Sequence, residues 1–165
     1  AGTGTTTITS DGLKILSTSD SPNPLNISFG NKRLFSKVGC SMIWSSAQIG
    51  AGGSRYEGLI NTINTYSTNV AMMFIHSGGC NFTTASSSSS GGTNTYDNNL
   101  SGLFPFIFTT YKIEQNKGNS KCFINNKLAA TRTGTQPEAD LQPFSTRYYS
   151  STGATYVRYV EAWNH

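Results

Sequence analysis

Residues 121–132, KCFINNKLAATR, decide the fold class of this chain. KCFIN (121–125) and LAATR (128–132) are two short runs of mainly apolar residues, and the turn between them is formed by Asn125, Asn126 and Lys127. Asparagine tolerates the left-handed backbone that tight hairpin turns require. The stretch therefore predicts two antiparallel strands joined by a short turn.

The end of the chain extends this β pattern. Residues 154–163, ATYVRYVEAW, alternate over their whole length, which predicts a strand. One face would carry Tyr156, Arg158, Val160 and Ala162, and the other Val157, Tyr159, Glu161 and Trp163. Along the whole chain we predict about ten to twelve short strands separated by turn signals, the pattern of an all-β antiparallel sandwich or jelly roll.

The composition favours the same class. Ser, Thr and Asn number 22, 21 and 15 of the 165 residues, and charged residues make up only 12%. Many Thr, Tyr and Phe with few Glu, Lys and Ala disfavour a helical protein. Plentiful aromatic residues and a small net charge disfavour disorder.

We predict one sandwich domain over residues 13–165, preceded by residues 1–12 as a polar extension or edge strand. The polar opening Ala1-Gly2-Thr3 does not resemble a signal peptide, and no apolar run approaches the roughly 18 residues that a membrane span needs. The formal charge is +4, but the Lys and Arg residues are scattered, so we expect neither nucleic-acid binding nor membrane insertion.

The three cysteines, Cys40, Cys80 and Cys122, are too far apart for a zinc pattern. Each lies beside small or apolar residues, which favours buried free thiols. One disulfide with one free thiol is the alternative. Of the two tryptophans, we expect both Trp44 and Trp163 in the core of the sandwich.

Two segments resemble the end of the concanavalin A-like (laminin G-like) jelly roll. Residues 121–131 resemble its hairpin, although Asn126 stands where that family usually has Gly, and residues 155–163 resemble its closing strand. The resemblance covers about 45 residues and implies the fold. Such modules commonly bind carbohydrate, and some use calcium. The hydroxyl-rich composition also resembles phage and viral fibre proteins with a receptor-binding role.

We expect no catalysis from this sequence. A laminarinase-like enzyme of the resembled fold would carry an E-x-D-x-x-E strand, and none is present. No G-x-S-x-G elbow, metalloprotease motif or nucleotide-binding motif is present either. If the chain were nevertheless a hydrolase, Glu57, Glu114 and Glu161 would be the carboxylates to test.

A carbohydrate site needs aromatic faces and polar hydrogen-bonding groups, and polar loops offer both. The predicted carbohydrate-binding residues are Tyr96, Asp97, Asn98, Asn99, Arg147, Tyr148 and Tyr149. Arg147 is the residue suited to an acidic sugar. Asp97 and Asn99 supply hard oxygen ligands for calcium, the one candidate cofactor.

The leading hypothesis is therefore a recognition domain on a virion or outside a cell, which binds cell-surface glycan through its loops. It would act as a homo-oligomer, because multivalency raises weak affinity. One alternative is a structural subunit of a fibre, capsid or filament that assembles through its Thr-rich N-terminal strand. The other is a polysaccharide-cleaving enzyme.

Overall fold

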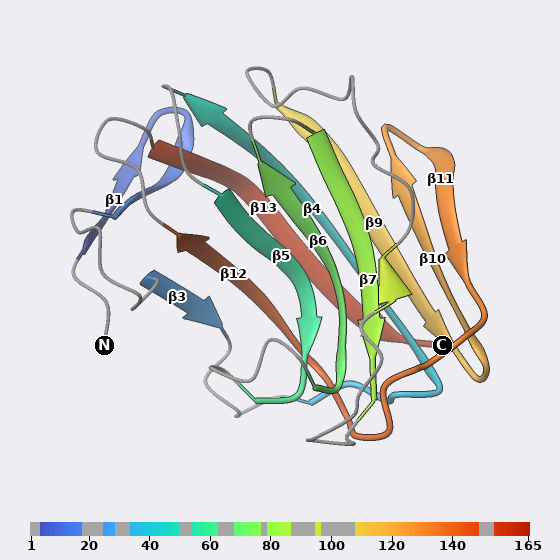
Figure 1. The fold of residues 1–165 in the computed structure, drawn as a ribbon. Helices are drawn as coiled ribbons and strands as arrows, with labels where there is room; N and C mark the ends of the chain where they lie inside the picture. The colour runs from blue at the N-terminus through green and yellow to red at the C-terminus, as the bar shows by residue number, and fades with distance from the viewer. Residues whose placement is uncertain are drawn as a thin grey trace.

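The chain folds as two antiparallel β-sheets packed face to face, as Figure 1 shows. This computed structural model describes residues 4–17, 25–28, 34–49, 54–62, 68–76, 79–86, 95–96, 108–148 and 154–165. The described residues form thirteen strands, and no helix among them is long and apolar enough to cross a membrane. The predicted all-β jelly-roll class is confirmed.

Sheet A contains seven strands in the order β1-β2-β13-β4-β9-β10-β11. Two of its central strands, β4 and β13, are each 11 residues long and pair antiparallel along most of their length. The strands of sheet A are β1 (Gly4–Thr9), β2 (Gly12–Ser17), β4 (Gly39–Ile49), β9 (Thr109–Asn116), β10 (Asn119–Ile124), β11 (Lys127–Arg132) and β13 (Ala154–Asn164).

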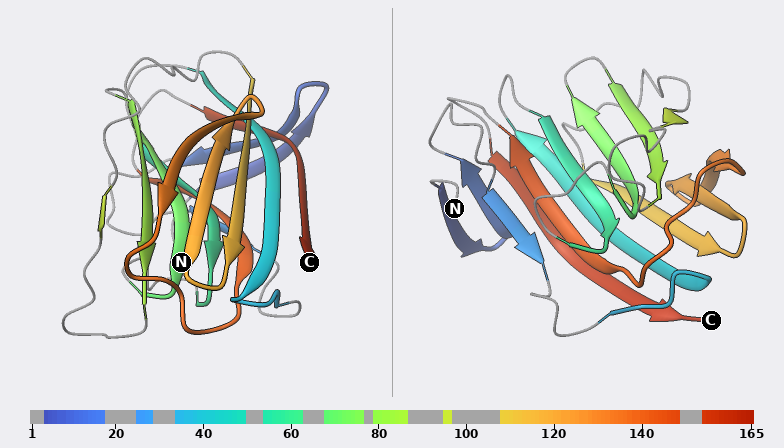
Figure 2. Two further views of the ribbon diagram at one scale, coloured as in Figure 1. Left: turned by 90° about the vertical axis from the view of Figure 1, so that its right-hand side faces the viewer. Right: turned by 60° about the horizontal axis from the view of Figure 1, so that its bottom comes forward.

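Sheet B contains six strands in the order β3-β12-β5-β6-β7-β8. Figure 2 shows it lying across sheet A, with the hairpin of β1 and β2 extending one end of sheet A. The strands of sheet B are β3 (Leu25–Ser28), β5 (Ser54–Ile60), β6 (Val70–His76), β7 (Gly79–Ala85), β8 (Thr95–Tyr96) and β12 (Gln142–Tyr148).

The hairpin predicted at residues 121–132 is confirmed. Strands β10 and β11 pair antiparallel, and the turn residues Asn125 and Asn126 have φ values of 49° and 65°. Two successive left-handed residues match the twist of the flanking strands, so Asn126 performs here the conformational role that glycine usually fills.

The main core lies between the sheets, where side chains from both inner faces meet. Trp44 from β4 is 1% exposed and stacks on Tyr111 of β9, with ring centroids 5.3 Å apart. Cys40 and Cys122 are buried free thiols, as predicted, and the Cys122 thiol lies 2.8 Å from Met73 Sδ. Burial, followed by the charge of Asp140, raises the pKa of Cys40 to about 12, so this thiol stays protonated. The side chain of Cys80 lies outside the described part of the structure.

A second buried apolar cluster lies on the outward face of sheet B. Its members alternate with inward-facing residues along β5, β6, β7 and β12, and adjacent strands place them side by side. They are Ile60, Val70, Met72, Ala85 and Phe144, with Tyr56 packed against them. Both faces of sheet B are therefore apolar at its centre.

Gly58 of β5 provides a test of this packing. Its φ is +150°, and a Cβ there would lie 2.6 Å from the Ala71 carbonyl oxygen and 2.7 Å from Met72 Cα. Because both are backbone atoms of the paired strand β6, they cannot turn aside. We expect Gly58→Ala to lower the free energy of unfolding by about 3 kcal/mol in urea titrations.

Gly134 is the matched control, since a Cβ there meets nothing within 4 Å. Gly134→Ala should change the free energy of unfolding by less than about 0.5 kcal/mol. Equal effects of the two substitutions would contradict the tight approach of β5 and β6.

Candidate functional site

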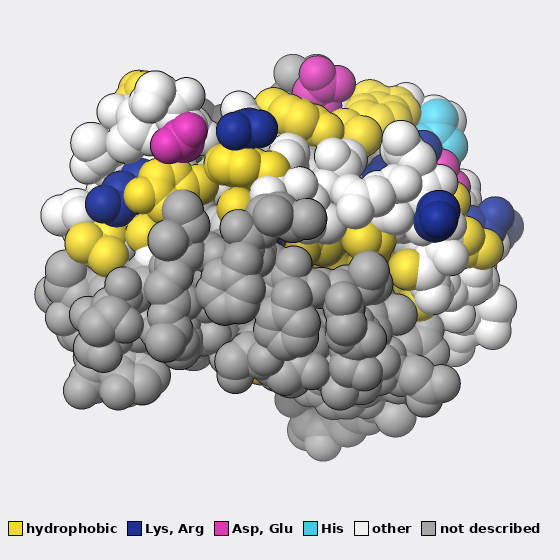
Figure 3. Space-filling model, turned by 90° about the horizontal axis from the view of Figure 1, so that it is seen from above, with side chains coloured by type: hydrophobic (Ala, Val, Ile, Leu, Met, Phe, Trp, Pro, Cys, Tyr) yellow, Lys and Arg dark blue, Asp and Glu magenta, His cyan; other side chains and the backbone are white. Residues whose placement is uncertain are grey.

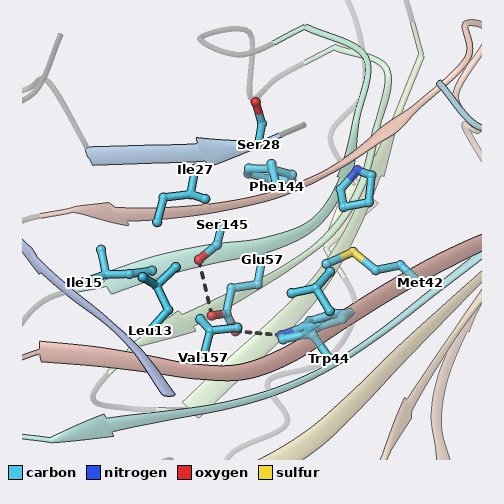
Figure 4. A pocket seen from close by; sticks show the side chains of 12 residues that line it. Leu13, Ile15, Ile27, Ser28, Met42, Trp44, Glu57, Phe144, Ser145 and Val157 are labelled. Atoms are coloured by element: carbon cyan, nitrogen blue, oxygen red, sulfur yellow. Dashed lines mark hydrogen bonds between the residues drawn. The ribbon is translucent and has the colours of Figure 1, made fainter. Parts of the chain in front are cut away.

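A carboxylate is buried between the two sheets. Glu57 of β5 is 0% exposed, and its Oε2 accepts hydrogen bonds from Trp44 Nε1 at 2.9 Å and Ser46 Oγ at 2.7 Å. Ser145 Oγ lies 3.4 Å from Oε1. Figure 4 shows Trp44 and Ser145 approaching Glu57 from opposite sides. These bonds connect β5 and β12 of sheet B to β4 of sheet A.

Two guanidinium groups are buried near this carboxylate. Arg55 Nε lies 3.2 Å from Glu57 Oε2, and both side chains are fully buried. Arg147 of β12 is the register partner of Arg55 and is 1% exposed. Its Nη1 donates a hydrogen bond to Thr155 Oγ1 at 2.6 Å. Among the described residues these three are the only fully buried charged side chains.

A cavity of about 80 Å³ adjoins this network. Its walls are almost entirely apolar and include Leu13, Ile15, Ile27 and Val157, as Figure 4 shows. Glu57 is the one charged residue in the lining. Sites for small molecules usually enclose several hundred Å³. This cavity is therefore too small for a sugar, and Glu57 is held by its partners as a structural group.

The outward face of sheet A, unlike the buried network, has aromatic and charged side chains that solvent reaches. Trp163 and Tyr159 of β13 are 38% and 41% exposed on it. The register places Glu161 beside Ile43, Ile43 beside Lys112, and Lys112 beside Phe123, so these side chains form one row across four strands. We call this surface the aromatic face, and its members are Tyr159, Glu161, Trp163, Ile43, Lys112, Glu114 and Phe123.

Lys112 lies at the centre of the aromatic face. Its Nζ is 5.4 Å from the ring centroid of Phe123, 5.9 Å from that of Trp163, and 2.6 Å from Glu114 Oε1. The Lys112 and Glu114 side chains are 30% and 25% exposed, so solvent reaches both. Figure 3 shows hydrophobic side chains interleaved with basic and acidic ones on the described surface. Aromatic rings, a cation and carboxylates are therefore accessible together.

Most of the predicted site residues lie outside the described part of the structure. Asp97, Asn98, Asn99 and Tyr149 are in this group, as are the side chains of Tyr96 and Tyr148, whose backbones end strands β8 and β12. The calcium prediction at Asp97 and Asn99 therefore stays a prediction. Within the described residues no group of three or more His, Cys, Asp or Glu could hold a metal ion.

Two predictions from the sequence were wrong. Arg147 does not line an exposed loop, because it belongs to β12 and its side chain points between the sheets, where it is 1% exposed. Trp163 is not in the core, because its position in β13 directs it to the outward face of sheet A. Trp44 is in the core, as predicted.

Sequence reasoning missed the aromatic face, although β13 contained the signal. The alternation groups Tyr159, Glu161 and Trp163 on one side of the strand. A carboxylate between two aromatic residues on the same side indicates a face that solvent reaches, since unpaired charges are rarely buried. No comparable signal identifies Lys112 or Phe123, because their neighbours belong to other strands.

The buried network predicts a large penalty for loss of its one carboxylate. Glu57→Gln would leave two buried guanidinium groups without a compensating charge, so we expect the free energy of unfolding to fall by about 3–5 kcal/mol. Glu114→Gln, which breaks a half-exposed ion pair, should cost less than about 1 kcal/mol. Urea unfolding of both variants measures the difference, and equal costs would contradict the structural role of Glu57.

Known proteins resemble this chain in structure and not in sequence. No protein-family model and no curated protein sequence matches it. A family 7 alginate lyase solved with substrate has a TM-score of 0.69 at 10% identity, covering 96% of this chain and 81% of the lyase. A Bacillus licheniformis β-glucanase has a TM-score of 0.61 at 15% identity, covering 97% and 82%. The carbohydrate-binding module CBM66 from Bacillus subtilis has a TM-score of 0.63 at 10% identity, covering 97% and 91%.

These neighbours contradict the expectation that the chain is not an enzyme. Several of the solved structures that resemble it are polysaccharide lyases and glucanases, which are enzymes of the same fold. The missing E-x-D-x-x-E strand excludes only one arrangement of carboxylates, and the sandwich supports catalysis with others. At these identities the likeness establishes the fold alone, a jelly-roll β-sandwich that lyases, glucanases and a carbohydrate-binding module share.

Proposed function

We propose that this chain cleaves a polysaccharide and holds it along the aromatic face of sheet A. The observation that carries the proposal is the exposed group of Trp163, Lys112, Phe123 and Glu114, which combines apolar rings with ionisable groups. The enzymes and the carbohydrate-binding module of the same fold support carbohydrate as the ligand class.

The dimensions of the aromatic face suit an extended chain. Trp163 and Tyr159 are four residues apart on β13, which corresponds to roughly 13 Å along a strand. Phe123 lies on β10, three strands away from β13, which corresponds to roughly 14 Å across the sheet. Three rings at this spacing offer separate platforms for the apolar faces of sugar units that are more than one unit apart along the polymer.

The same surface holds groups that exchange protons. Both hydrolysis and β-elimination of a glycosidic bond need one group that accepts a proton and one that donates it. Glu114 and Glu161 are the carboxylates of the aromatic face. Lys112 is paired with Glu114 on the same strand, β9, and lies in one row with Glu161 of β13, with Ile43 of β4 between them. Lys112 adds a positive charge that would neutralise a sugar carboxylate or a developing oxyanion.

Sheet B offers no such combination in its described residues. Its outward side chains at the centre are the buried apolar cluster of Ile60, Val70, Met72, Ala85 and Phe144. Neighbouring outward residues are Thr83, Thr146 and Gln142, which carry no charge. This difference between the two outward faces favours sheet A as the substrate surface.

The proposal predicts that the two kinds of aromatic-face residue have separable effects. Purified protein would be tested on alginate, an acidic polymer, and on mixed-linkage β-glucan, a neutral one. Reducing ends report cleavage, ultraviolet absorbance of unsaturated ends identifies β-elimination, and affinity electrophoresis reports binding. We expect Trp163→Ala to weaken binding about tenfold. Glu114→Gln and Glu161→Gln should retain binding, and at least one should lower kcat about a hundredfold.

Matched controls lie elsewhere on the surface. Ile8→Ala removes an apolar side chain that is 88% exposed on β1, and Asp11→Asn removes an exposed carboxylate in the turn after β1. Both should leave binding and cleavage unchanged. Folded protein that releases no ends from either polymer contradicts the enzyme proposal. Binding that is as tight in Trp163→Ala as in the wild-type protein contradicts the assignment to the aromatic face.

A second candidate function, assembly through β1, is supported by the free edge of sheet A. The two-residue turn Ser10–Asp11 makes Thr9 and Gly12 a hydrogen-bonded pair, so Gly4, Thr6 and Ile8 direct their backbone groups away from β2. Residues 4–9 contain no charge and no proline, and Ile8 is 88% exposed. Edge strands without such protection readily pair with another chain.

This candidate predicts self-association that depends on Ile8. Ile8→Lys places a charge on the edge and should shift the protein to the monomer in sedimentation velocity runs, as should deletion of residues 1–10. Leu128→Lys, at another exposed apolar position that is 58% exposed, is the control and should not change the distribution. A wild-type protein that stays monomeric at high concentration rules the assembly out.

A further inference from the structure

The last part of β13 has one edge that no described strand covers. β2 pairs with β13 only from Thr155 to Val157, whereas β13 continues to Asn164. Figure 2 shows this last part of β13 along the outer margin of sheet A, below the hairpin of β1 and β2. A strand edge left open in this way presents backbone groups to which another strand can bond.

The register determines which backbone groups this edge presents. His165 N–H donates to the Gly39 carbonyl oxygen at 3.0 Å, and antiparallel pairs alternate between hydrogen-bonded and non-bonded. The outward-facing residues of β13 therefore bond to β4, and the alternate residues turn their N–H and C=O groups away from it. We call these alternate residues the β13 edge, and they are Val160, Ala162 and Asn164.

The β13 edge borders the apolar cavity between the sheets. Val160 lines this cavity and is also 36% exposed, so this wall of the cavity reaches the surface. Leu13 of β2 lines the same cavity. A strand added to the β13 edge would direct alternate side chains to this inner side. The residue opposite Val160 should therefore be apolar.

β1 has a matching free edge and one exposed apolar side chain. Its backbone groups directed away from β2 belong to Gly4, Thr6 and Ile8, three alternate residues like those of the β13 edge. Ile8 is 88% exposed and is the register partner of Leu13, so both side chains lie on the same face of the hairpin. β1 therefore offers an apolar side chain at the end of an uncharged strand.

We propose that β1 of one copy pairs antiparallel with the β13 edge of the next copy. The three opposed pairs are Ile8 with Val160, Thr6 with Ala162, and Gly4 with Asn164. Gly4 suits its position, because Ser36 N–H already donates to Asn164 Oδ1 there and leaves little room for a side chain. The two joined surfaces differ, so copies associate head to tail. This inference rests on the assembly through β1 proposed above and adds the place where β1 docks.

The first test joins Ile8 to Val160 by a disulfide between copies. Ile8→Cys and Val160→Cys would be made in separate proteins, each carrying Cys80→Ser because Cys40 and Cys122 are buried. Opposed residues of a hydrogen-bonded antiparallel pair lie about 5.5 Å apart at Cα, within the range of a disulfide. Oxidation of the mixed proteins should give the dimer of one copy of each as the main cross-linked product, identified by peptide mass spectrometry.

Leu128→Cys, at an exposed apolar position on β11, is the control partner for Ile8→Cys and should cross-link only at the rate of random collision. A main product that joins two Ile8→Cys copies would show that β1 pairs with β1. That result overturns docking on β13 and leaves the assembly through β1 standing. Wild-type protein that stays monomeric at high concentration overturns both.

The second test removes one donor of the β13 edge and keeps the pairing with β4. Ala162→Pro deletes an N–H that points to the open edge, where a sheet tolerates proline. We expect the Kd of self-association to rise about tenfold in sedimentation velocity runs, while circular dichroism shows folded protein. An unchanged Kd overturns the docking site. The disulfide test decides the case if Ala162→Pro does not fold.

Discussion

The hydrogen bond from Trp44 Nε1 to Glu57 Oε2 is the interaction on which the arrangement of the two sheets depends. It joins the middle of β4 to the middle of β5 across the core, and both side chains are buried. An indole N–H buried in an apolar interior needs an acceptor, and a buried carboxylate needs donors and a counter-charge. Because Glu57 is satisfied only when Ser46 and Arg55 also reach it, the network fixes the lateral position of one sheet on the other.

The position of β4 determines which side chains of its neighbours in sheet A face the core. Trp44 stacks on Tyr111 of β9, and the register of β4 with β9 and β13 then determines which residues of those strands face outward. Lys112, Glu161 and Phe123 meet in one row only in this register, since a shift of one residue would turn each of them into the core. One strand register thus places the buried network on the inner face of sheet A and the aromatic face on its outer face.

The sequence contains much of the fold and little of the site. The Asn125–Asn126 turn and the ten-residue alternation of β13 are local signals, and both appear as expected. Arg55, Glu57 and Arg147 are charged residues among serines and tyrosines, a setting typical of exposed strands. Their burial depends on meeting one another across β5, β12 and β4, and separations of up to about 100 residues hide such pairs from any local pattern.

The apolar outward face of sheet B bears on where the proposed substrate would be held. A sheet with one wet face alternates apolar and polar residues, whereas β6 reads as a continuous apolar run, Val70 to Ile75, because both of its faces are covered at the centre. Val70 and Ile60 are fully buried, so this face already resembles a core and supplies no charge within the described residues. Ionisable and aromatic groups that solvent reaches together lie on sheet A, around Lys112. If the proposed function holds, the substrate surface is therefore expected on the sheet whose outward face the strand sequences leave uncovered.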